Sequence, residues 1–480
     1  MIKPYGQSLA LLTDLYQLTM AQGYWREGLA EREAVFHHFF RRAPFGGAFA
    51  VAAGLDTALQ WLAALRFRDD DLEYLAGLAG EGGRPLFEPG FFDYLREFAF
   101  ECHLDAMPEG TAVFPQEPII RVRGPLLQCQ LAETGILNIV NFQTLIATKA
   151  ARVCLAAGDD PVLEFGLRRA QGIDGGLHAS RAAYIGGCAA TSNVLAGKLY
   201  GVPVGGTHAH SWVLAFDDEL EAFEAFARAM PHNCILLVDT YDTVAGVRKA
   251  IEVGVRLRDS GHRLLGIRLD SGDLRTLSKQ ARRMLDEAGL ESTQIVASND
   301  LDEYWIAALK RRGARIGVWG VGTSIAAGTG DAALGGVYKL SLLKDPAGIW
   351  RDTAKRSEDP AKASTPGMLQ VRRYSDQAGA TADLIYDESR APAGKWGGSP
   401  FDEATAEMRI EPRGAHEDLL KPALQQGRPV GPRETPVDAR SRCRAQLAAL
   451  PRAVLRPRDP GAFPVLVEDG LARRRQAVQG

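Results

Sequence analysis

The middle of the chain alternates short apolar runs with helix-like stretches, and this alternation constrains the fold more than any other feature. Each run is rich in β-branched residues and is followed by a turn rich in Gly, Asp or Ser. The six runs end at Phe165, Val204, Val238, Leu269, Ala297 and Val321. Near-continuous apolar strands separated by helices are typical of parallel β/α units. A seventh run, GGVYKLSLL at 335–343, follows closely, so we expect an α/β fold with a closed or nearly closed β/α barrel rather than an open sheet.

Two of the connecting stretches carry clear helix signals. Residues 216–230, FDDELEAFEAFARAM, place acidic residues in the first turn and apolar residues at helical spacing. Residues 273–289, DLRTLSKQARRMLDEAG, open at Asp273, a natural N-cap residue, and end with a glycine just past the last turn. Buried strands joined by capped amphipathic helices make the fold assignment consistent.

The flanking regions differ from the middle in composition. Residues 34–55 predict two strands around a Pro/Gly turn, and residues 111–137 add further strand-like runs. Residues 351–373 are polar and contain proline, and the last hundred residues are rich in Arg, Ala and Pro. We therefore expect an N-terminal mixed α+β domain at 1–130, the barrel at 131–345, and a loop-rich peripheral region at 346–480 that packs partly on the N-terminal domain.

Charge and cysteine usage exclude several classes of protein. The 480 residues carry a formal net charge of −3, without the basic excess that binding to nucleic acid or to a membrane surface needs. The N-terminal residues lack the pattern of a signal peptide, and no run of about 18 apolar residues predicts a membrane span. The 6 cysteines form no C-x-x-C pair and no metal-type spacing. We expect a cytoplasmic protein with reduced thiols.

Polar residues gather where the predicted strands end. The strand-end segments are EFGLRRAQG (164–172), GGTHAHS (205–211), DTYDT (239–243), RLDSGD (268–273), SNDLDE (298–303) and GVGTS (320–324). In β/α barrels the carboxyl ends of the strands meet at one face, which carries the reactive groups. This convergence indicates an enzyme that handles a phosphate or a sugar.

The segment RLDSGD offers a cation and two carboxylates within six residues. Arg268 and Asp270 share one face of a strand, because side chains alternate with a period of two. An arginine fork binds a carboxylate or a phosphate through two hydrogen bonds, and Asp270 with Asp273 could hold Mg²⁺ or accept from ribose hydroxyls. The alternative is an Arg268–Asp270 ion pair that only satisfies itself.

Two other segments suit an anion or an aromatic ring. In GVGTS, Gly322 and Thr323 lie in a turn whose backbone N–H groups can form an anion nest, although a plain strand-to-helix turn is equally expected. There is no GxxxxGK[ST] segment, so this is not a P-loop. Phe165, three residues before Arg168, could present an aromatic face beside a cation, or could belong to the barrel core.

The two histidines of GTHAHS are open to several interpretations. His208 and His210 would share a strand face, a spacing that metal sites also use. A zinc site needs a third protein ligand, and no second His or Cys cluster lies nearby in the sequence. A histidine at a strand end can also act as a base or a nucleophile. Spacing alone does not choose between a metal ligand and a nucleophile.

Taken in order, the segments resemble a known family. TDLYQLTM, EFGLRRAQG, GTHAHS, VDTYDT, RLDSGDL, GVGTS and GGVYKL resemble the nicotinate phosphoribosyltransferases, of the type II phosphoribosyltransferase class. The resemblance runs from Thr13 to Leu340, and the chain after about 345 resembles the family only loosely. It implies an irregular α/β barrel and a second domain built from N-terminal and later segments.

The resemblance implies a reaction and its participants. The family joins nicotinate to 5-phosphoribosyl 1-diphosphate (PRPP), giving nicotinate mononucleotide and diphosphate in NAD salvage. ATP is a co-substrate whose hydrolysis is coupled through a phosphorylated histidine, and Mg²⁺ is the implied cofactor. Relatives form dimers with the active site at the subunit interface. We expect no nucleic-acid partner.

The resemblance also assigns roles to residues. His210 takes the phosphohistidine position, and His208 falls at a variable position of the motif. Thr207, Tyr16 and Arg268 match positions that contact nicotinate. A dimer interface would explain how Tyr16, remote in sequence, reaches the site.

Further positions follow from the same resemblance. Thr323 matches a contact to a PRPP phosphate. Phe165 and Arg168 match the ring-stacking and phosphate-binding positions of the sister nicotinamide enzymes, and Asp239 and Asp270 match their contacts to the PRPP ribose. Arg268 and Asp270 join His210 as the residues expected at the chemistry, since cations and carboxylates stabilise a transition state of oxocarbenium character.

Other functions remain open at this point. The first alternatives are a phosphoribosyltransferase for nicotinamide or for quinolinate. Quinolinate carries two carboxylates and should need more cations than Arg168 and Arg268 supply. A barrel that binds nucleotides or sugar phosphates without turnover is another alternative, and a zinc hydrolase using His208 and His210 is the last.

Overall fold

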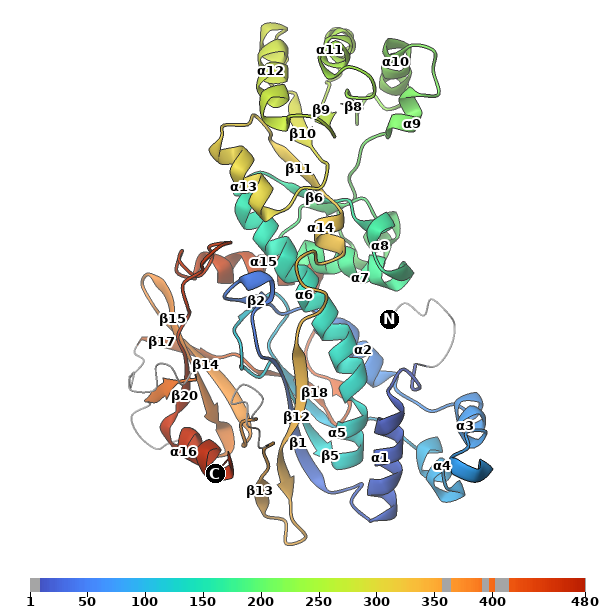
Figure 1. Cartoon of the computed structure of the whole chain (residues 1–480), viewed down its shortest axis with the longest axis vertical. Coiled ribbons are helices and arrows are strands. Elements are labelled where there is room, and N and C mark those ends of the chain that lie inside the picture. The colour runs from blue at the N-terminus through green and yellow to red at the C-terminus, as the bar shows by residue number, and fades with distance from the viewer. Residues whose placement is uncertain (1–8, 356–363, 391–396, 402–413, 480) are drawn as a thin grey trace. The chain divides into compact units, whose positions relative to one another are not determined.

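The chain groups into two compact units in a computed structural model that describes residues 9–355, 364–390, 397–401 and 414–479. One unit contains Met1–Leu145 and Ala333–Gly480, and the other contains Ile146–Ala332 (Figure 1). Part of the polar stretch expected to be loop, 356–363, lies outside the described residues. Among the described residues, no helix combines the length and the apolar character that crossing a membrane requires.

The unit at 146–332 is built on a six-stranded parallel sheet, as the apolar runs predicted. The strand order is β7-β6-β11-β10-β9-β8, and every neighbouring pair is parallel. The strands are β6 (Val162–Glu164), β7 (Ala190–Thr191), β8 (Ile235–Leu237), β9 (Gly266–Leu269), β10 (Gln294–Ala297) and β11 (Val318–Val321). Five of the six predicted run ends lie within β9, β10 and β11 or at the residue after β6 and β8.

Helices connect these strands, and aspartates begin four of them. The side chains of Asp218, Asp242, Asp273 and Asp302 each accept a hydrogen bond from a backbone N–H in the first turn of the helix that follows. The helices are α7 (Gly172–Ile185), α8 (Val194–Tyr200), α9 (His210–Val213), α10 (Glu219–Ala229), α11 (Thr243–Asp259), α12 (Leu274–Glu287), α13 (Glu303–Arg311) and α14 (Thr323–Ala326). The predicted helices correspond to α10 and α12.

Two of the predicted strands are placed differently. Val204 makes only a single parallel bridge, to Thr191, and the strand itself is β7. The run GGVYKLSLL forms β12 (Gly336–Lys344), but β12 pairs antiparallel with β1 (Glu33–Phe40) in the other unit. The expectation that it adds a seventh parallel strand is therefore wrong, because an apolar run predicts a strand without specifying its partner.

The other unit contains a seven-stranded sheet of order β13-β12-β1-β5-β3-β18-β19. The segment 34–55 supplies β1 and β2, which lie in different sheets, because β2 pairs with β4. The remaining strands are β2 (Ala50–Val51), β3 (His103–Ala106), β4 (Ala112–Val113), β5 (Ile120–Pro125), β13 (Trp350–Asp352), β18 (Lys421–Gln425) and β19 (Arg428–Pro429). The helices before β6 are α1 (Leu15–Arg26), α2 (Leu55–Ala63), α3 (Asp69–Ala76), α4 (Pro89–Arg96), α5 (Leu126–Leu131) and α6 (Glu133–Ala157). The end of segment 111–137, expected to be strand-like, is thus helical.

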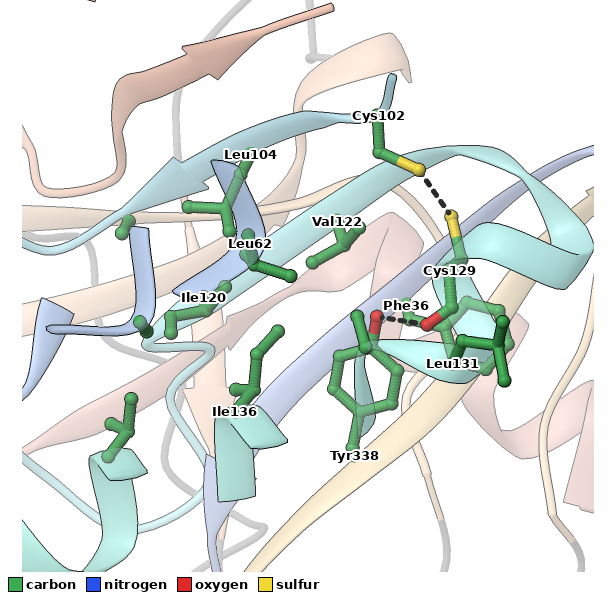
Figure 2. Close-up of a cluster of buried hydrophobic side chains, with 14 of the residues drawn as sticks. Phe36, Leu62, Cys102, Leu104, Ile120, Val122, Cys129, Leu131, Ile136 and Tyr338 are labelled. Carbon is green, nitrogen blue, oxygen red and sulfur yellow. Dashed lines mark hydrogen bonds between the residues drawn. The ribbon is translucent and has the colours of Figure 1, made fainter. Parts of the chain in front are cut away.

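The core of this unit includes buried residues of its seven-stranded sheet and of helices α1 to α6, and Figure 2 shows part of it. The ring of Tyr338 stacks on Phe36 with centroids 5.0 Å apart, and its hydroxyl donates to the carbonyl of Cys129 at 2.9 Å. The Sγ atoms of Cys102 and Cys129 lie 3.6 Å apart, and none of the six cysteines, all of them in the described part of the chain, forms a disulfide. This core fixes β12 against β1 through contacts between residues distant in sequence.

The C-terminal part of the chain forms a sheet where loops were expected. Its strand order is β16-β20-β15-β14-β17. Arg373 in β14 is buried, pairs with Asp383 in β15, and lies over the rings of Phe114 and Phe463. The strands are β14 (Leu369–Asp376), β15 (Gly379–Asp387), β16 (Gly398–Pro400), β17 (Ala415–Asp418) and β20 (Val465–Glu468), with helices α15 (Pro436–Ala448) and α16 (Asp469–Gln479). The loop prediction failed here because arginines paired within a sheet are polar in sequence but buried in the fold.

Close packing of α11 on the end of β8 holds the loop between them. A Cβ atom added to Gly246, in the second turn of α11, would lie 2.1 Å from the carbonyl oxygen of Val238. The residues after Val238 begin the polar segment DTYDT. A glycine at 246 therefore sets how closely the helix approaches this strand end.

We predict that Gly246→Ala destabilises the protein, because the methyl group forces α11 away from β8. Overpacking of this kind costs about 1–3 kcal/mol. The matched control is Gly175→Ala in α7, where an added Cβ meets nothing within 4 Å. Thermal unfolding should show a lowered midpoint for the first variant only. A Gly246→Ala protein that melts at or above the wild-type midpoint would contradict this packing.

Candidate active site

The candidate site lies at the carboxyl edge of the parallel sheet, entirely within the unit at 146–332. Phe165 follows β6, Asp239 follows β8 closely, and Asp270 follows β9 directly. Ser298 follows β10, and Gly322 follows β11. Because the strands are parallel, these residues emerge at the same edge.

Arg268, near the end of β9, links several of these groups. Its Nε donates to Ser298 Oγ at 2.8 Å, its Nη1 to Thr207 Oγ1 at 3.0 Å, and its Nη2 to Asp270 Oδ1 at 2.8 Å. The guanidinium lies 5.7 Å from the centre of the Phe165 ring, within cation–π range. One cation thus connects residues at the ends of three strands with Thr207 from the segment before α9.

The internal Arg268–Asp270 ion pair, which the sequence offered as an alternative, is present. It uses only part of the hydrogen-bonding capacity of the arginine. A guanidinium carries five N–H groups, two on each terminal nitrogen. Nη1 and Nη2 each donate once to the partners above. Among the described residues, no second acceptor contacts either terminal nitrogen, so each has a second N–H with which to bind an anion.

Asp270 connects the arginine to His210. Asp270 Oδ1 accepts from Arg268 and from the hydroxyl of Ser298, and Oδ2 lies 3.7 Å from His210 Nε2. Burial alone would raise the pKa of Asp270, but the Ser298 hydrogen bond and the charge of Arg268 outweigh burial and lower the pKa below its ordinary value. Asp270 is therefore an ionised carboxylate at neutral pH, beside the imidazole.

His210 begins α9 and is held from two sides. Its Nδ1 lies 3.1 Å from Thr240 Oγ1, and its Nε2 faces Asp270. Its side chain is 39% exposed, so the ring is accessible, while the contact to Thr240 and the nearby carboxylate of Asp270 favour one orientation. The residues that orient His210 are thus Thr240 and Asp270, which the sequence pattern did not single out for this role.

Asp239 is buried, and only one of its two carboxylate oxygens has hydrogen-bond partners among the described residues. Its Oδ2 accepts from the backbone N–H of Asp270 and from the hydroxyl of Ser271, both at 2.7 Å. Its Oδ1 is buried and has no hydrogen-bond partner among the described residues. An unpaired buried carboxylate oxygen is costly unless a ligand supplies a donor or a cation.

The glycines of GVGTS make room for Phe165. A Cβ added to Gly320 would lie 2.7 Å from the Phe165 ring, and one added to Gly322 would lie 3.0 Å from the Phe165 carbonyl oxygen. These glycines are therefore required by close packing within the fold. Thr323 is exposed at the start of α14, and the hydroxyl of Ser324 is buried without a partner among the described residues.

Glu164 is a residue that sequence reasoning did not select. It is 1% exposed, and its carboxylate accepts from the backbone N–H of Gly166 and from the hydroxyls of Ser180 and Thr191 at 2.9 and 2.6 Å. It fixes the end of β6, from which Phe165 extends. The one feature of the sequence that could have indicated Glu164 is its position directly before the site segment FGLRR.

Other predicted site residues lie apart from this network. Asp273, a candidate metal ligand, caps α12. Its carboxylate accepts hydrogen bonds from Arg275 and Thr276 in the first turn of that helix. Arg168 is exposed in the single turn Leu167–Arg169. Tyr16 is half-exposed on α1 in the other unit, where burial together with the charge of Glu133 raises its pKa.

The two histidines do not form a metal site in the part of the chain that the structure describes. Nε2 of His208 accepts from the backbone N–H of Leu237 at 3.1 Å, whereas His210 faces Asp270. Among the described residues, no group of three or more His, Cys, Asp or Glu side chains could hold a metal ion. This geometry disfavours the zinc alternative.

Comparison with known proteins gives the family. The N-terminal domain of nicotinate phosphoribosyltransferase (NAPRTase) matches residues 11–141, and the NAPRTase C-terminal domain matches 370–475. The second match overturns the expectation that the chain after about 345 resembles the family only loosely.

Individual relatives agree with this assignment. A nicotinate phosphoribosyltransferase of Bacillus subtilis is 48% identical over 388 residues, 79% of this chain and 77% of the relative. The human nicotinate phosphoribosyltransferase is 37% identical over 529 residues, covering 96% of this chain and 95% of the relative.

Solved structures show the same fold. The crystal structure of human nicotinic acid phosphoribosyltransferase superposes with a TM-score of 0.83 at 34% identity, covering 98% of this chain and 100% of that one. The nicotinate-nucleotide pyrophosphorylase from Pyrococcus furiosus, at 22% identity and a TM-score of 0.69, covers 92% of this chain and 95% of its own and shares the fold. The chain belongs to the nicotinate phosphoribosyltransferase family.

Proposed function

We propose that the chain joins nicotinate to PRPP, releasing diphosphate and forming nicotinate mononucleotide, a step of NAD salvage that is coupled to ATP hydrolysis. Membership of the family supports this reaction. The observation that carries the proposal is the connected set of Thr207, Arg268, Asp270 and His210 at one edge of the sheet.

Arg268 is the group proposed to select nicotinate. The free N–H groups of its two terminal nitrogens suit a carboxylate, which accepts through two oxygens. Nicotinamide has no such anion, and so it would leave the cation without its partner. The ring of Phe165, under the same guanidinium, offers an aromatic face for the pyridine.

His210 is the group proposed to accept phosphate from ATP. An ionised Asp270 can only accept, so it favours a proton on Nε2 and leaves the lone pair on Nδ1. In this arrangement Nδ1 attacks the γ-phosphorus, an N–P bond forms, the bond to the bridging oxygen breaks, and ADP leaves. The hydroxyl of Thr240 donates to Nδ1 before the attack, so this hydrogen bond must break before the N–P bond can form.

Asp239 and Asp270 are proposed to face the PRPP ribose. The unpaired Oδ1 of Asp239 fits a hydroxyl donor or a cation carried in with the substrate. Mg²⁺ would be held mainly by the phosphates of the substrate, with the carboxylates of Asp239 and Asp270 beside it, because this ion prefers oxygen ligands. When bound, Mg²⁺ would neutralise charge on the leaving diphosphate.

Several further features extend the proposal. Closure of the parallel sheet into an irregular barrel is supported by the bridge from Thr191 to Val204, which adds chain beyond the edge strand β7. We also propose a cytoplasmic homodimer whose interface brings Tyr16 to the site of a partner. Arg168, Gly322 and Thr323 are proposed to contact phosphate.

We predict that γ-labelled ATP gives an acid-labile, base-stable phosphoenzyme that His210→Ala abolishes. The reason is that His210 supplies the only nitrogen nucleophile in the proposed transfer. His232→Ala is the matched control, since His232 is exposed and lies against His262. Label retained by the His210→Ala protein at the wild-type level would overturn the assignment.

We predict that Ser298→Ala lowers kcat/KM for nicotinate about tenfold, corresponding to about 1.4 kcal/mol. The substitution keeps the charge of Arg268 but removes the acceptor for its Nε and a donor to Asp270. Steady-state kinetics with nicotinate, PRPP and ATP measure the effect, and the exposed Ser292 provides the control variant Ser292→Ala. Unchanged kinetics in Ser298→Ala would show that Arg268 needs no such support.

The same assay separates the alternatives. Nicotinate, nicotinamide and quinolinate are each offered with PRPP, and diphosphate release is measured with and without ATP. Turnover confined to nicotinate agrees with the proposal. Turnover of nicotinamide or quinolinate would favour the related enzymes, and no release with any of the three would revive the non-catalytic barrel.

A further inference from the structure

His208 is buried, although it lies between two residues of the site. Its exposed fraction is 8%, and its ring packs edge-on against Phe226 of α10 with centroids 4.7 Å apart. Its Nε2 accepts from the backbone N–H of Leu237 at 3.1 Å, and its Nδ1 lies 3.2 Å from the carbonyl oxygen of Ala209. Both ring nitrogens therefore meet backbone groups.

These two partners determine the tautomer. A backbone N–H only donates, so Nε2 must carry a lone pair; a carbonyl only accepts, so Nδ1 must carry the proton. The ring that fits this place is neutral, with its proton on Nδ1. Protonation would turn Nε2 into a donor aimed at another donor and would break the contact to Leu237.

The contact to Leu237 occupies the free side of an edge strand. β8 ends the described sheet order, and its neighbour on the other side is β9. The N–H of Val238 donates to the Arg268 carbonyl in β9, so the N–H of the preceding residue, Leu237, points away from β9. The imidazole of His208 takes the place that a strand carbonyl would have there.

We propose that His208 is a positioning residue whose side chain docks the segment 207–210 onto β8 and thereby orients Thr207 toward Arg268 and His210 toward Thr240. The proposal rests on the proposed function, since Thr207 and His210 matter as parts of that site. Thr207 directly precedes His208, and His210 is two residues away, so a displaced ring moves both contacts. Sequence reasoning treated His208 as a variable position.

The charges around His208 favour the neutral ring. Burial lowers its pKa most, the hydrogen bond to Ala209 opposes this, and Arg268 from β9 and His210 from its own segment lower the pKa further. From α10 the rings of Phe223 and Phe226 face it, and the buried Glu219 of that helix is paired with Lys249 of α11.

The pH dependence follows from the direction of this shift. An unfolded histidine takes up its proton near pH 6.5, whereas the folded one resists until a lower pH. The contribution of His208 to stability is therefore complete above about pH 6.5 and declines as the pH falls toward the pKa of the folded state. A side chain that cannot titrate removes this part of the acid sensitivity.

The test compares His208→Gln, which retains an acceptor for Leu237, with His208→Leu, which fills the space without one. At pH 8, we expect His208→Leu to raise KM for nicotinate and to slow phosphorylation of His210, each at least tenfold, and His208→Gln to stay within about threefold of wild type. We also expect His208→Gln to lose less activity and less thermal stability than wild type between pH 6.5 and 5.5. A His208→Leu enzyme with wild-type KM and phosphorylation rate would overturn the proposal.

A second measurement judges His208 independently of catalysis. Nitrogen-15 NMR of the histidine-labelled full chain at pH 7.5 should show one ring, absent from the His208→Gln spectrum, as the neutral Nδ1–H tautomer. A protonated ring or the Nε2–H tautomer would refute the proposed contact. If no form of the protein turns over nicotinate, the proposed function fails, while this spectrum still decides the state of His208.

Discussion

The site depends on one cation, Arg268, whose side chain is 13% exposed and which contacts residues at several strand ends. Arg268 projects from β9 and is held by Ser298 after β10, by Asp270 after its own strand, and by Thr207 from the segment before α9. An isolated guanidinium would be mobile and strongly hydrated, whereas this one is held in place before any ligand arrives. Asp270 also lies 3.7 Å from Nε2 of His210, so the groups proposed to recognise nicotinate and to receive phosphate share one carboxylate neighbour.

Much of this arrangement was predictable because its causes are local. Buried parallel strands must be apolar along their length, and the helices that follow them begin at residues able to cap a backbone N–H. Asp273 was predicted as such a cap, and the structure confirms it. Parallel strands then bring their carboxyl ends together, so polar residues at those ends converge. The clustering of Arg268, Asp270, Thr207 and His210 followed from this rule and from the family resemblance.

What was missed depends on contacts between distant residues. The sequence of β12 cannot reveal that its partner is β1, and Arg373 in β14 looks solvent-exposed until Asp383 and two phenylalanine rings surround it. From the sequence, the glycines of GVGTS suit a loop that binds a ligand. In the structure, Gly320 is required because the ring of Phe165 leaves no room for a side chain there. His208 is the same kind of case, because its partner is a backbone N–H at the edge of a strand.

The proposed selectivity depends on where nicotinate places its carboxylate, and a crystal structure of the protein with nicotinate bound tests this most directly. The predicted result is a carboxylate with both oxygens at about 2.7–3.2 Å from Nη1 and Nη2 of Arg268, and the pyridine ring against Phe165. A carboxylate held by other groups, with Arg268 still bonded only to Thr207, Asp270 and Ser298, would contradict it.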